Sequence, residues 1–321
     1  MINTLYDYTG DIVVEPTFFT PEMYGAVGDG TTDDTSAVQT AVSKQCVQFT
    51  SGKTYKVTAP IRIKKDTLID LNGATIRCTD KHLFYNFEDG DSYSGYNGNG
   101  NIIIANGTIV GGCISFIHGY DIKLININFK NVLNDHFLEI CACNNYIIDS
   151  CSFVGMKNLT GAALEYINID TNASYPAFPH NKSGQNDPVF YDMSVSDGIT
   201  IRDCYFSVGE GTYAYGFNAI GAHSRNVNAT YTKNVTFMNN TIRGFTGCGI
   251  RVNAMDGVMV DGNDIQTVGD GIRIGDVADA KNIVIKGNYV ACGGTRLVRT
   301  SGAYTNLTVA NNVKQGDTQD F

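Results

Sequence analysis

The chain has 321 residues, of which 43% are hydrophobic and 17% are charged, and its formal net charge is −9. No cluster of lysine and arginine stands out, and this excludes nucleic acid as the main partner because phosphate binding requires a local positive field. No run of about 18 apolar residues is present, so we expect no membrane span.

The composition is typical of a turn-rich β protein, with 35 glycines against 6 prolines. Residues 1–20 are expected to be a lead-in to one domain over residues 21–321. The first residues, MINTLYDYTGDIVVEP, lack the basic and then apolar pattern of a signal peptide. The nine cysteines are an odd number, and without a secretion signal we expect them to be reduced and mostly buried.

A short capping helix is the first element predicted in this domain. The polar sequence TDDT at residues 32–35 precedes AVQTAV at residues 37–42, whose apolar residues have helical spacing. Acidic residues at a helix N-terminus interact favourably with the helix dipole. We therefore predict a helix over about residues 32–43, covering the open end of the fold that follows it.

An eight-residue pattern, apolar at its first, third and eighth places, recurs along most of the chain. Its copies are Ile69–Ile76, Ile102–Ile109, Ile122–Phe129, Tyr146–Phe153, Ile199–Phe206, Val235–Ile242, Val258–Ile265, Ile283–Val290 and the shortened Leu307–Val313. Most successive copies begin 20–25 residues apart. Because one such unit cannot bury its apolar face alone, the units must stack. The pattern predicts an all-β fold, a single-stranded right-handed parallel β-helix of roughly nine to ten turns.

The sixth place of the repeat is predicted to lie at a bend. Cys151 and Cys204 occupy this place, as do Asn240, Asn263 and Asn288. Asparagine is common at turns because its side chain bonds the local backbone. We expect these residues to stack on one another in successive coils.

The segment at residues 21–42, PEMYGAVGDGTTDDTSAVQTAV, resembles the N-terminal motif of the pectate-lyase superfamily. Residues 93–265, including YNGNGNIIIANGTI and NDHFLEICACNNYIIDSCSF, are similar to phage and prophage tail proteins of Gram-positive hosts. This resemblance implies a tailspike-like depolymerase that cleaves a bacterial capsular or cell-wall polysaccharide. It also implies a homotrimer in the virion tail or on an extracellular surface, assembled in the host cytoplasm, with other tail proteins as further partners.

A second short strand follows each repeat, and its middle residue is expected to point outward. These residues form a predicted exterior column of Glu139, Asn168, Asn218, Arg251 and Arg273. Two flanking columns hold Cys141, Asp170, Ile220, Asn253 and Gly275 on one side and His136, Glu165, Tyr215, Cys248 and Asp270 on the other. Rungs about 4.8 Å apart would make the central column about 19 Å long, the length of several sugar rings.

The carboxylates of these columns are the predicted catalytic groups. Strand geometry puts Glu139 and Asp170 roughly 8 Å apart, a separation that suits an inverting glycosidase with one acid and one base. Glu165 is an alternative to either partner, and His136 and His223 are candidate acid/base groups. We expect Glu139 and Asp170 to be exposed. The residues expected to hold the substrate are Asn168, Asn218, Arg251, Asn253, Arg273, Tyr215 and Asp270.

Three functions remain open at this point: a hydrolase, a lyase acting on a uronic acid polymer, and a receptor-binding spike without catalysis. Hydrolysis is the favoured function because of the carboxylate separation. There is a partial likeness to polygalacturonase-type glycosidases at Asn168-Ile-Asp170 and Gly249-Ile-Arg251, but their Asp-Asp pair is absent and their Gly-His-Gly motif is not intact. Asn253, however, stands where those enzymes have a lysine, so galacturonate is not implied.

No cofactor is predicted, and no compact set of histidines and carboxylates indicates a metal ion. His82, His118 and His180 are expected to be structural. Two insertions, residues 86–101 and 171–198, are long enough to be functional. Their aromatic residues Tyr93, Tyr96, Tyr175 and Phe178 are candidates for stacking on sugars.

Overall fold

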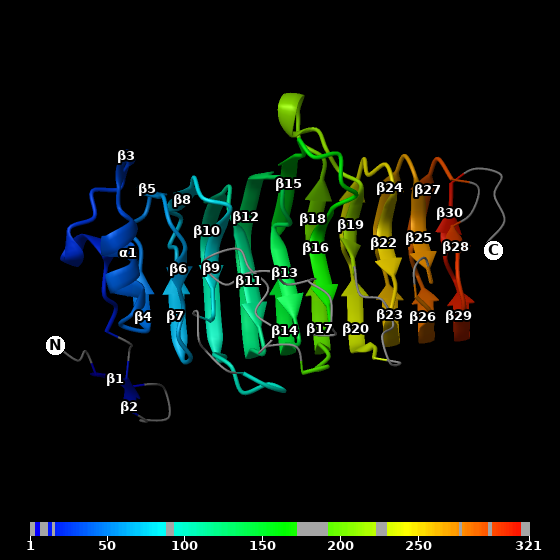
Figure 1. Ribbon diagram of the computed structural model, residues 1–321, viewed down its shortest axis with the longest axis horizontal. Coiled ribbons are helices and arrows are strands. Elements are labelled where there is room, and N and C mark those ends of the chain that lie inside the picture. The colour runs from blue at the N-terminus through cyan, green and yellow to red at the C-terminus, as the bar shows by residue number, and fades with distance from the viewer. Residues whose placement is uncertain are drawn as a thin grey trace.

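The computed structural model describes residues 17–87, 93–171, 192–222, 230–275, 278–294 and 297–315, together with the backbone of two short N-terminal strands. These two strands, β1 (Thr4–Tyr6) and β2 (Ile12–Val14), pair antiparallel. The rest of the described chain winds into a right-handed parallel β-helix, whose coils follow one another from the N-terminal to the C-terminal end (Figure 1). The repeat therefore predicted the fold class correctly.

Each coil contributes strands to three parallel sheets. The first sheet contains β4 (Cys46–Gln48), β7 (Thr67–Asp70), β10 (Ile102–Val110), β12 (Tyr120–Leu133), β14 (Asn144–Asp149), β17 (Asp197–Arg202), β20 (Thr232–Met238), β23 (Met255–Asp261), β26 (Ala280–Lys286) and β29 (Tyr304–Ala310). The second contains β3 (Asp29–Asp33), β5 (Thr54–Val57), β8 (Thr75–Cys78), β15 (Ser152–Lys157), β18 (Tyr205–Ser207), β21 (Thr241–Arg243), β24 (Asp264–Thr267), β27 (Tyr289–Cys292) and β30 (Val313–Lys314), and β10 and β12 continue into it.

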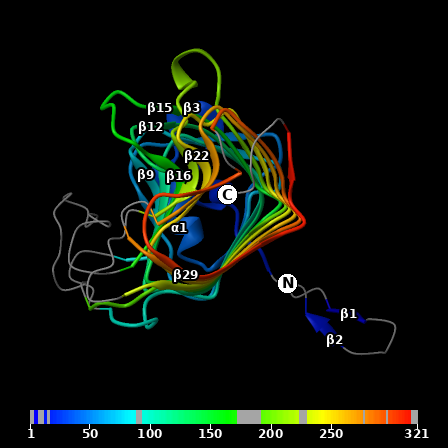
Figure 2. The ribbon, with the colours of Figure 1, turned by 90° about the vertical axis from the view of Figure 1, so that its right-hand side faces the viewer.

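The third sheet has nine strands in the described residues, and it positions the candidate site. They are β6 (Ile61–Arg62), β9 (His82–Tyr85), β11 (Cys113–Ile117), β13 (Leu138–Cys141), β16 (Glu165–Asp170), β19 (Asn218–Gly221), β22 (Cys248–Val252), β25 (Asp270–Ile274) and β28 (Val298–Thr300). Viewed along the axis, the coils superimpose closely (Figure 2).

The N-terminal end of the coil is covered by α1 (Thr35–Val42), which lies inside the range predicted for the helix. Its buried residues Ala37, Val38, Ala41 and Val42 belong to the main hydrophobic core. Asp34 precedes the helix, and its carboxylate accepts hydrogen bonds from the backbone N–H groups of residues 27 and 28 at 2.7 and 3.1 Å. Two short 3₁₀ helices, Pro21–Tyr24 and Gly211–Tyr213, complete the described helices. None of these helices is long and apolar enough to cross a membrane.

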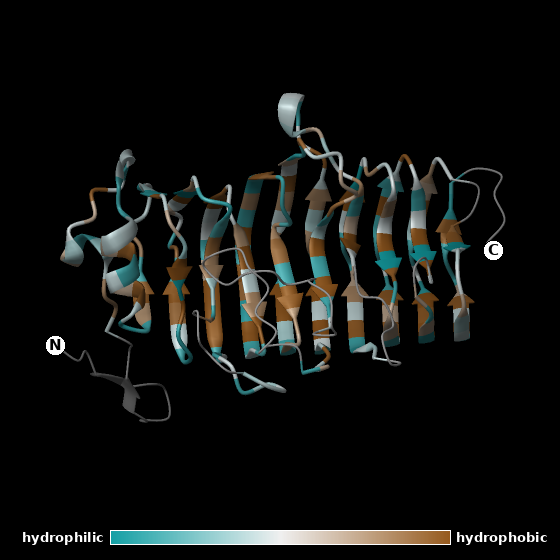
Figure 3. Cartoon of the chain, viewed as in Figure 1, coloured by the Kyte–Doolittle hydropathy of each residue, from teal (hydrophilic) through white to brown (hydrophobic). Residues whose placement is uncertain are grey.

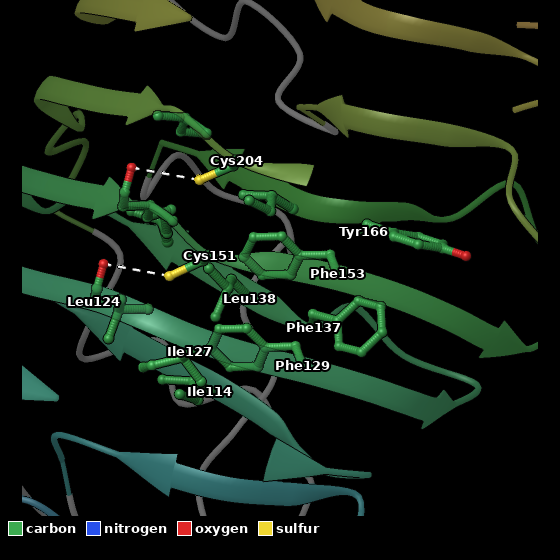
Figure 4. Packing of buried hydrophobic residues seen from close by; sticks show 14 of the residues in the cluster. Ile114, Leu124, Ile127, Phe129, Phe137, Leu138, Cys151, Phe153, Tyr166 and Cys204 are labelled. Carbon is green, nitrogen blue, oxygen red and sulfur yellow. Dashed lines mark hydrogen bonds between the residues drawn. The ribbon is translucent and has the colours of Figure 1, made fainter. Parts of the chain in front are cut away.

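Apolar and polar bands alternate along the strands of the β-helix (Figure 3). Inside it, aromatic side chains of successive coils stack on one another. The rings of Phe129 and Phe153 lie nearly parallel with centroids 4.8 Å apart (Figure 4), and the Phe206 ring stacks on Phe153 at 4.9 Å. Such ring stacking adds to the stabilisation that burial supplies.

All nine cysteines lie in the described residues, where none forms a disulfide, and seven of them are buried, as predicted. The thiols of Cys151 and Cys204 donate to the carbonyl oxygens of Leu124 and Ile148 at 3.5 and 3.7 Å (Figure 4). These two side chains occupy the bend that asparagines occupy in the later coils.

The predicted asparagine stack is present, and it extends one coil further. Asn240, Asn263 and Asn288 are buried, and each donates its side-chain amide to the carboxamide oxygen of the next residue at 2.8–2.9 Å, with Asn312 as the last acceptor. Each of the three also donates a second hydrogen bond to a backbone carbonyl. The asparagine ladder therefore satisfies backbone groups that the bends would otherwise leave buried without partners.

Candidate functional site

The exterior of the third sheet carries polar side chains in columns, and we call it the polar face. In β16, Tyr166, Ile167 and Ile169 belong to the core, whereas Glu165, Asn168 and Asp170 do not. Two successive residues therefore point inward before the alternation resumes. The same order recurs in β22, where Ile250 and Val252 are in the core and Arg251 is not.

In each strand, one outward residue lies between the last two core residues, as Asn168 lies between Ile167 and Ile169. These outward residues form the middle column. Backbone pairing aligns Ser115, Glu139 and Asn168 at its N-terminal end and Arg251, Arg273 and Arg299 at its C-terminal end. Gly221 lies between these two groups. The leading column aligns Glu165 with Asn218, Cys248 and Asp270. Cys141 and Asp170 are paired in the trailing column.

The predicted positions of Asn218, Tyr215 and Ile220 are wrong by three residues. Gly221, and not Asn218, occupies the middle column of β19, and Asn218 occupies the leading position that Tyr215 was expected to fill. Ile220 is fully buried in the core. The sequence Phe217-Asn218-Ala219 imitates the apolar–polar–apolar order of the other strands, but burial of Ile220 fixes a different register.

The predicted exposure of the carboxylates is also wrong. Glu139, Glu165 and Asp170 are 4%, 0% and 1% exposed. Strand alternation determines whether a side chain points into the coil or out of it, but not what lies over the exterior of the sheet. The face is buried around β13 and β16, and its accessibility rises toward β28, where the Arg299 side chain is 57% exposed.

Glu165 and Arg251 form an ion pair that spans two coils. Arg251 Nη1 lies 3.0 Å from Glu165 Oε1, and Asn218 Nδ2 donates to the same oxygen at 3.0 Å. Gly221 lies between the two residues, and a Cβ atom there would come within 2.7 Å of Glu165 Cγ. The glycine therefore leaves the space through which the two side chains meet.

Two further carboxylates of the polar face are hydrogen-bonded within it. Asp170 Oδ2 accepts from Asn168 Nδ2 at 3.0 Å. Asp270 Oδ2 accepts from the Nε and Nη2 atoms of Arg273 at 2.9 and 2.7 Å, and Arg299 Nη1 lies 3.5 Å from the same oxygen. Burial raises the pKa of the nearby Cys248 thiol to about 12, so this cysteine stays protonated.

A second cluster lies at the N-terminal end of the polar face, and the sequence did not indicate it. It contains His82 of β9, Cys113 of β11, Asp135 and His136 from the turn that precedes β13, and Glu139 of β13. His82 pairs with Cys113 across adjacent strands, and Asp135 reaches the same place from the next coil. The sequence gives only a weak signal for it, because His82, Cys113 and Asp135 fall in three successive coils but not at equivalent places within them.

The electrostatics of this cluster are dominated by burial and by Asp135. Burial lowers the pKa of His82 below its usual value, although the charge of Asp135 acts in the opposite direction. Lys81 Nζ lies 3.2 Å from Asp135 Oδ2. Burial opposes the charged form of Lys81, but the Asp135 carboxylate outweighs it and raises the pKa of Lys81. Burial also raises the pKa of the Cys113 thiol well above its ordinary value.

Several predicted site residues have structural contacts. Asn253 Oδ1 accepts from the backbone N–H of Ala278 at 2.7 Å, and the Tyr215 hydroxyl donates to the carbonyl oxygen of Ala162 at 2.5 Å. The Tyr93 hydroxyl accepts from Asn99, and the Tyr96 hydroxyl donates to the Val195 carbonyl.

The remaining histidines and loop aromatics divide into two groups. His118 is fully buried with Nδ1 2.7 Å from the Gly95 carbonyl oxygen, in agreement with the structural role expected of it. His223, His180, Tyr175 and Phe178 lie outside the described residues.

The fold and the face together define a right-handed parallel β-helix with a polar exterior sheet. No model of a known protein family matches the chain. It is 24% identical over 291 residues to the plasmin and fibronectin-binding protein A of Streptococcus pneumoniae, covering 78% of this chain and 39% of that protein. It is 41% identical over 58 residues to a capsule-specific depolymerase of Klebsiella phage K64-1, covering 17% of this chain and 8% of that protein.

Solved structures show the same fold. The crystal structure of PfbA, a surface adhesin of Streptococcus pneumoniae, superimposes with a TM-score of 0.78 at 21% identity, covering 94% of this chain and 80% of that chain. The tailspike of the Escherichia coli bacteriophage HK620, solved with a pentasaccharide, gives a TM-score of 0.61 at 13% identity, covering 96% of this chain and 56% of that chain. The chain spans about two fifths of the first curated relative and less than a tenth of the second.

Proposed function

We propose that this β-helix is a receptor-binding module that binds an anionic surface polysaccharide along its polar face without cleaving it. The observation that carries the proposal is the ladder of Arg251, Arg273 and Arg299, one from each of three adjacent strands in register. Stacked rungs repeat about every 4.8 Å, so the ladder presents a guanidinium group at each step along the helix axis.

Accessibility favours binding by the arginines over cleavage by the carboxylates. The side chains of Arg251, Arg273 and Arg299 are 11%, 15% and 57% exposed, and this exposure increases toward the C-terminal end of the sheet. A general acid or base must come within hydrogen-bonding distance of the reacting atoms. The carboxylates of β13 and β16 are almost completely buried, so a polymer reaches the arginines first.

The charges of the ladder favour an acidic ligand. Among the described residues, the ion pairs of this part of the face join three guanidinium groups to two carboxylates, those of Glu165 and Asp270. Arginine binds carboxylate and phosphate groups through paired hydrogen bonds, which makes it suited to uronic acid, sialic acid or phosphate substituents. The similarity to a surface adhesin and to a capsule-specific depolymerase agrees with a role in surface recognition.

Replacing Arg299 by alanine is expected to weaken binding of acidic polysaccharides by about tenfold at low salt, the value of one hydrogen bond between charged groups. The difference should shrink as the salt concentration rises, because ions screen exposed charges. Calorimetric titration with hyaluronan and polygalacturonate, and with dextran as the neutral probe, measures both effects.

The matched control is Arg202→Ala. Arg202 belongs to the first sheet, its side chain is 43% exposed, and it is paired with Asp149 as Arg299 is paired with Asp270. Equal losses for the two variants, or equal binding of dextran and the acidic polymers by the wild type, would contradict the proposal. Binding to immobilised fibronectin or plasmin instead of the polysaccharides would point to a protein receptor.

Cleavage of the polysaccharide is the second candidate function. Glu139 and Asp170 belong to paired strands, with Glu139 opposite Asn168 and Cys141 opposite Asp170, and this is the register from which the roughly 8 Å separation follows. Glu165 and His136 lie beside them, and the His136 ring contacts the Glu165 carbonyl oxygen at 2.6 Å. A lyase would instead use Arg251 or Arg273 to neutralise a uronate.

Glu139→Gln and Asp170→Asn distinguish binding from hydrolysis. If the face hydrolyses its ligand, each variant should lower turnover by about 100-fold or more while binding persists, because each removes an acid/base group. Our expectation under the binding proposal is that the wild type releases no product. A reducing-end assay, combined with ultraviolet absorbance as the readout for an unsaturated lyase product, decides among the three functions.

The homotrimer, the tail-protein partners and the location on a virion or cell surface stay predictions. A surface location agrees with the similarity to PfbA, which is a surface adhesin. Light scattering that gives the mass of a single chain, 34.8 kDa, would contradict the homotrimer.

A further inference from the structure

We propose that His82, Cys113 and Asp135 bind a divalent transition-metal ion, with zinc the best match, at the N-terminal end of the polar face. The three residues come from three successive coils, so their meeting depends on the stacking of the β-helix. The proposed site lies at the opposite end of the face from the arginine ladder, and it is independent of polysaccharide binding.

The distances fit a shared ion. One donor atom from each of the three side chains lies within 4.8 Å of the others. His82 Nε2 and Asp135 Oδ2 are 3.9 Å apart, which is too long for a hydrogen bond. Two ligands bound tetrahedrally to zinc are roughly 3.3–3.7 Å apart, given zinc–ligand distances of about 2.0–2.3 Å. The His82 and Asp135 donor atoms therefore need to approach each other by only a few tenths of an ångström to bind one ion.

A cation already occupies part of this space. The ammonium group of Lys81 lies 3.2 Å from Asp135 Oδ2, and Asp135 is 4% exposed. The Lys81 side chain itself is 49% exposed, so it can swing into solvent when a metal ion takes its place. Asp135 Oδ1 accepts from the backbone N–H of His136 at 2.9 Å, which holds the carboxylate with Oδ2 toward His82.

The donor set selects the class of metal. A thiolate, an imidazole and a carboxylate together suit zinc and similar ions, whereas calcium and magnesium prefer oxygen ligands alone. Asp135 also belongs to a second group with His136 and Glu139, in which His136 Nε2 lies 3.8 Å from Glu139 Oε1. His136 Nδ1 is bonded to the Glu165 carbonyl oxygen at 2.6 Å, the kind of contact that orients metal-bound histidines.

A cavity is lined by sequence neighbours of the cluster. It has a volume of about 500 Å³, and its lining includes Asp80, Lys81 and Asn134, which are the immediate neighbours of the cluster in the sequence. Ion binding requires loss of the Cys113 thiol proton to solvent, so that the thiolate sulfur can coordinate the metal.

The experiment uses the full chain, stripped with a chelator, dialysed and then titrated with Zn²⁺ or Co²⁺. We expect about one ion per chain, a rise of several degrees in the melting temperature with Zn²⁺, and a thiolate-to-cobalt charge-transfer absorption with Co²⁺. Cys113→Ser should abolish that absorption, and His82→Gln should weaken zinc binding tenfold or more. Cys46→Ser is the matched control, since Cys46 is a half-buried free cysteine of β4 outside the cluster.

Lys81→Met tests the proposal in the opposite direction. This variant removes the competing ammonium group, so zinc should bind it more tightly than the wild type, and the result does not require Cys113→Ser to fold. The proposal would be overturned if the wild type bound no stoichiometric zinc. It would also be overturned if Lys81→Met left zinc affinity unchanged and Cys113→Ser retained the cobalt–thiolate absorption.

Discussion

Replacing Asn263 by alanine is expected to lower the free energy of unfolding by about 3 kcal/mol or more, since buried polar groups left without partners cost about 1–3 kcal/mol each. The Asn263 side chain donates to the carbonyl oxygen of Phe237 at 3.0 Å and to Asn288 Oδ1 at 2.9 Å. Its own Oδ1 accepts from the backbone and side-chain N–H groups of Asn240, both at 2.9 Å. Denaturant unfolding measures the loss.

The control for this prediction is Asn128→Ala. Asn128 is an exposed residue of β12 whose side chain accepts a hydrogen bond from the Ser152 hydroxyl. Its replacement should change stability by no more than about 0.5 kcal/mol, as is usual for surface positions. A loss of less than about 1 kcal/mol for Asn263→Ala would show that the asparagine ladder is not a major source of stability.

Replacing Arg251 by methionine should cost about 3–5 kcal/mol, because removal of one partner leaves the other charge buried. Glu165 has no exposed surface, and Arg251 Nη1 lies 3.0 Å from its carboxylate. The sequence alone led us to expect that Arg251 mainly holds substrate, but its contact with Glu165 gives it a structural role as well. Thermal or denaturant unfolding of the variant tests this.

The double variant Arg251→Met with Glu165→Gln separates charge from packing. Replacement of a complete buried ion pair is often close to neutral, so the double variant should recover much of the stability that the single variant loses. If the two substitutions simply add, the ion pair is not the cause of the loss. The structural role of Arg251 is also the reason why Arg299 is the better position for testing ligand binding.

The repeat made the fold predictable because each coil places equivalent residues at equivalent points. Apolar places one, three and eight identified the strands, and the shared sixth place identified the asparagine ladder. These features depend on local periodicity and on stacking, both of which can be read from one sequence.

The polar face was predictable only in part. The register of Glu139 with Asn168 and of Arg251 with Arg273 followed from the alternating pattern, but the register of β19 did not. Two successive inward residues shift the phase of alternation, and nothing in the sequence near Asn218 marks that shift.

Local sequence patterns could predict neither the burial of the carboxylates nor the histidine–cysteine–aspartate cluster. Burial of Glu139 and Asp170 depends on what lies over the sheet, and periodicity carries no information about that. Asp135 lies outside the strands, and the pairing of β9 with β11 shifts register at Cys113, so equal spacing in the sequence does not place these residues together.

The register of the third sheet gives the polar face a direction along the helix axis. Every strand of this sheet runs parallel to its neighbours, and the residues of the middle column change from Ser115 and Glu139 at one end to Arg273 and Arg299 at the other. The two ends of the polar face therefore differ chemically, and turning the molecule end over end does not give an equivalent surface. A linear ligand that follows the axis meets a different chemical environment at each end, so one of its two directions must be preferred. A polymer end-labelled with a spin or fluorescent probe would report that direction by its distance from a label in β28.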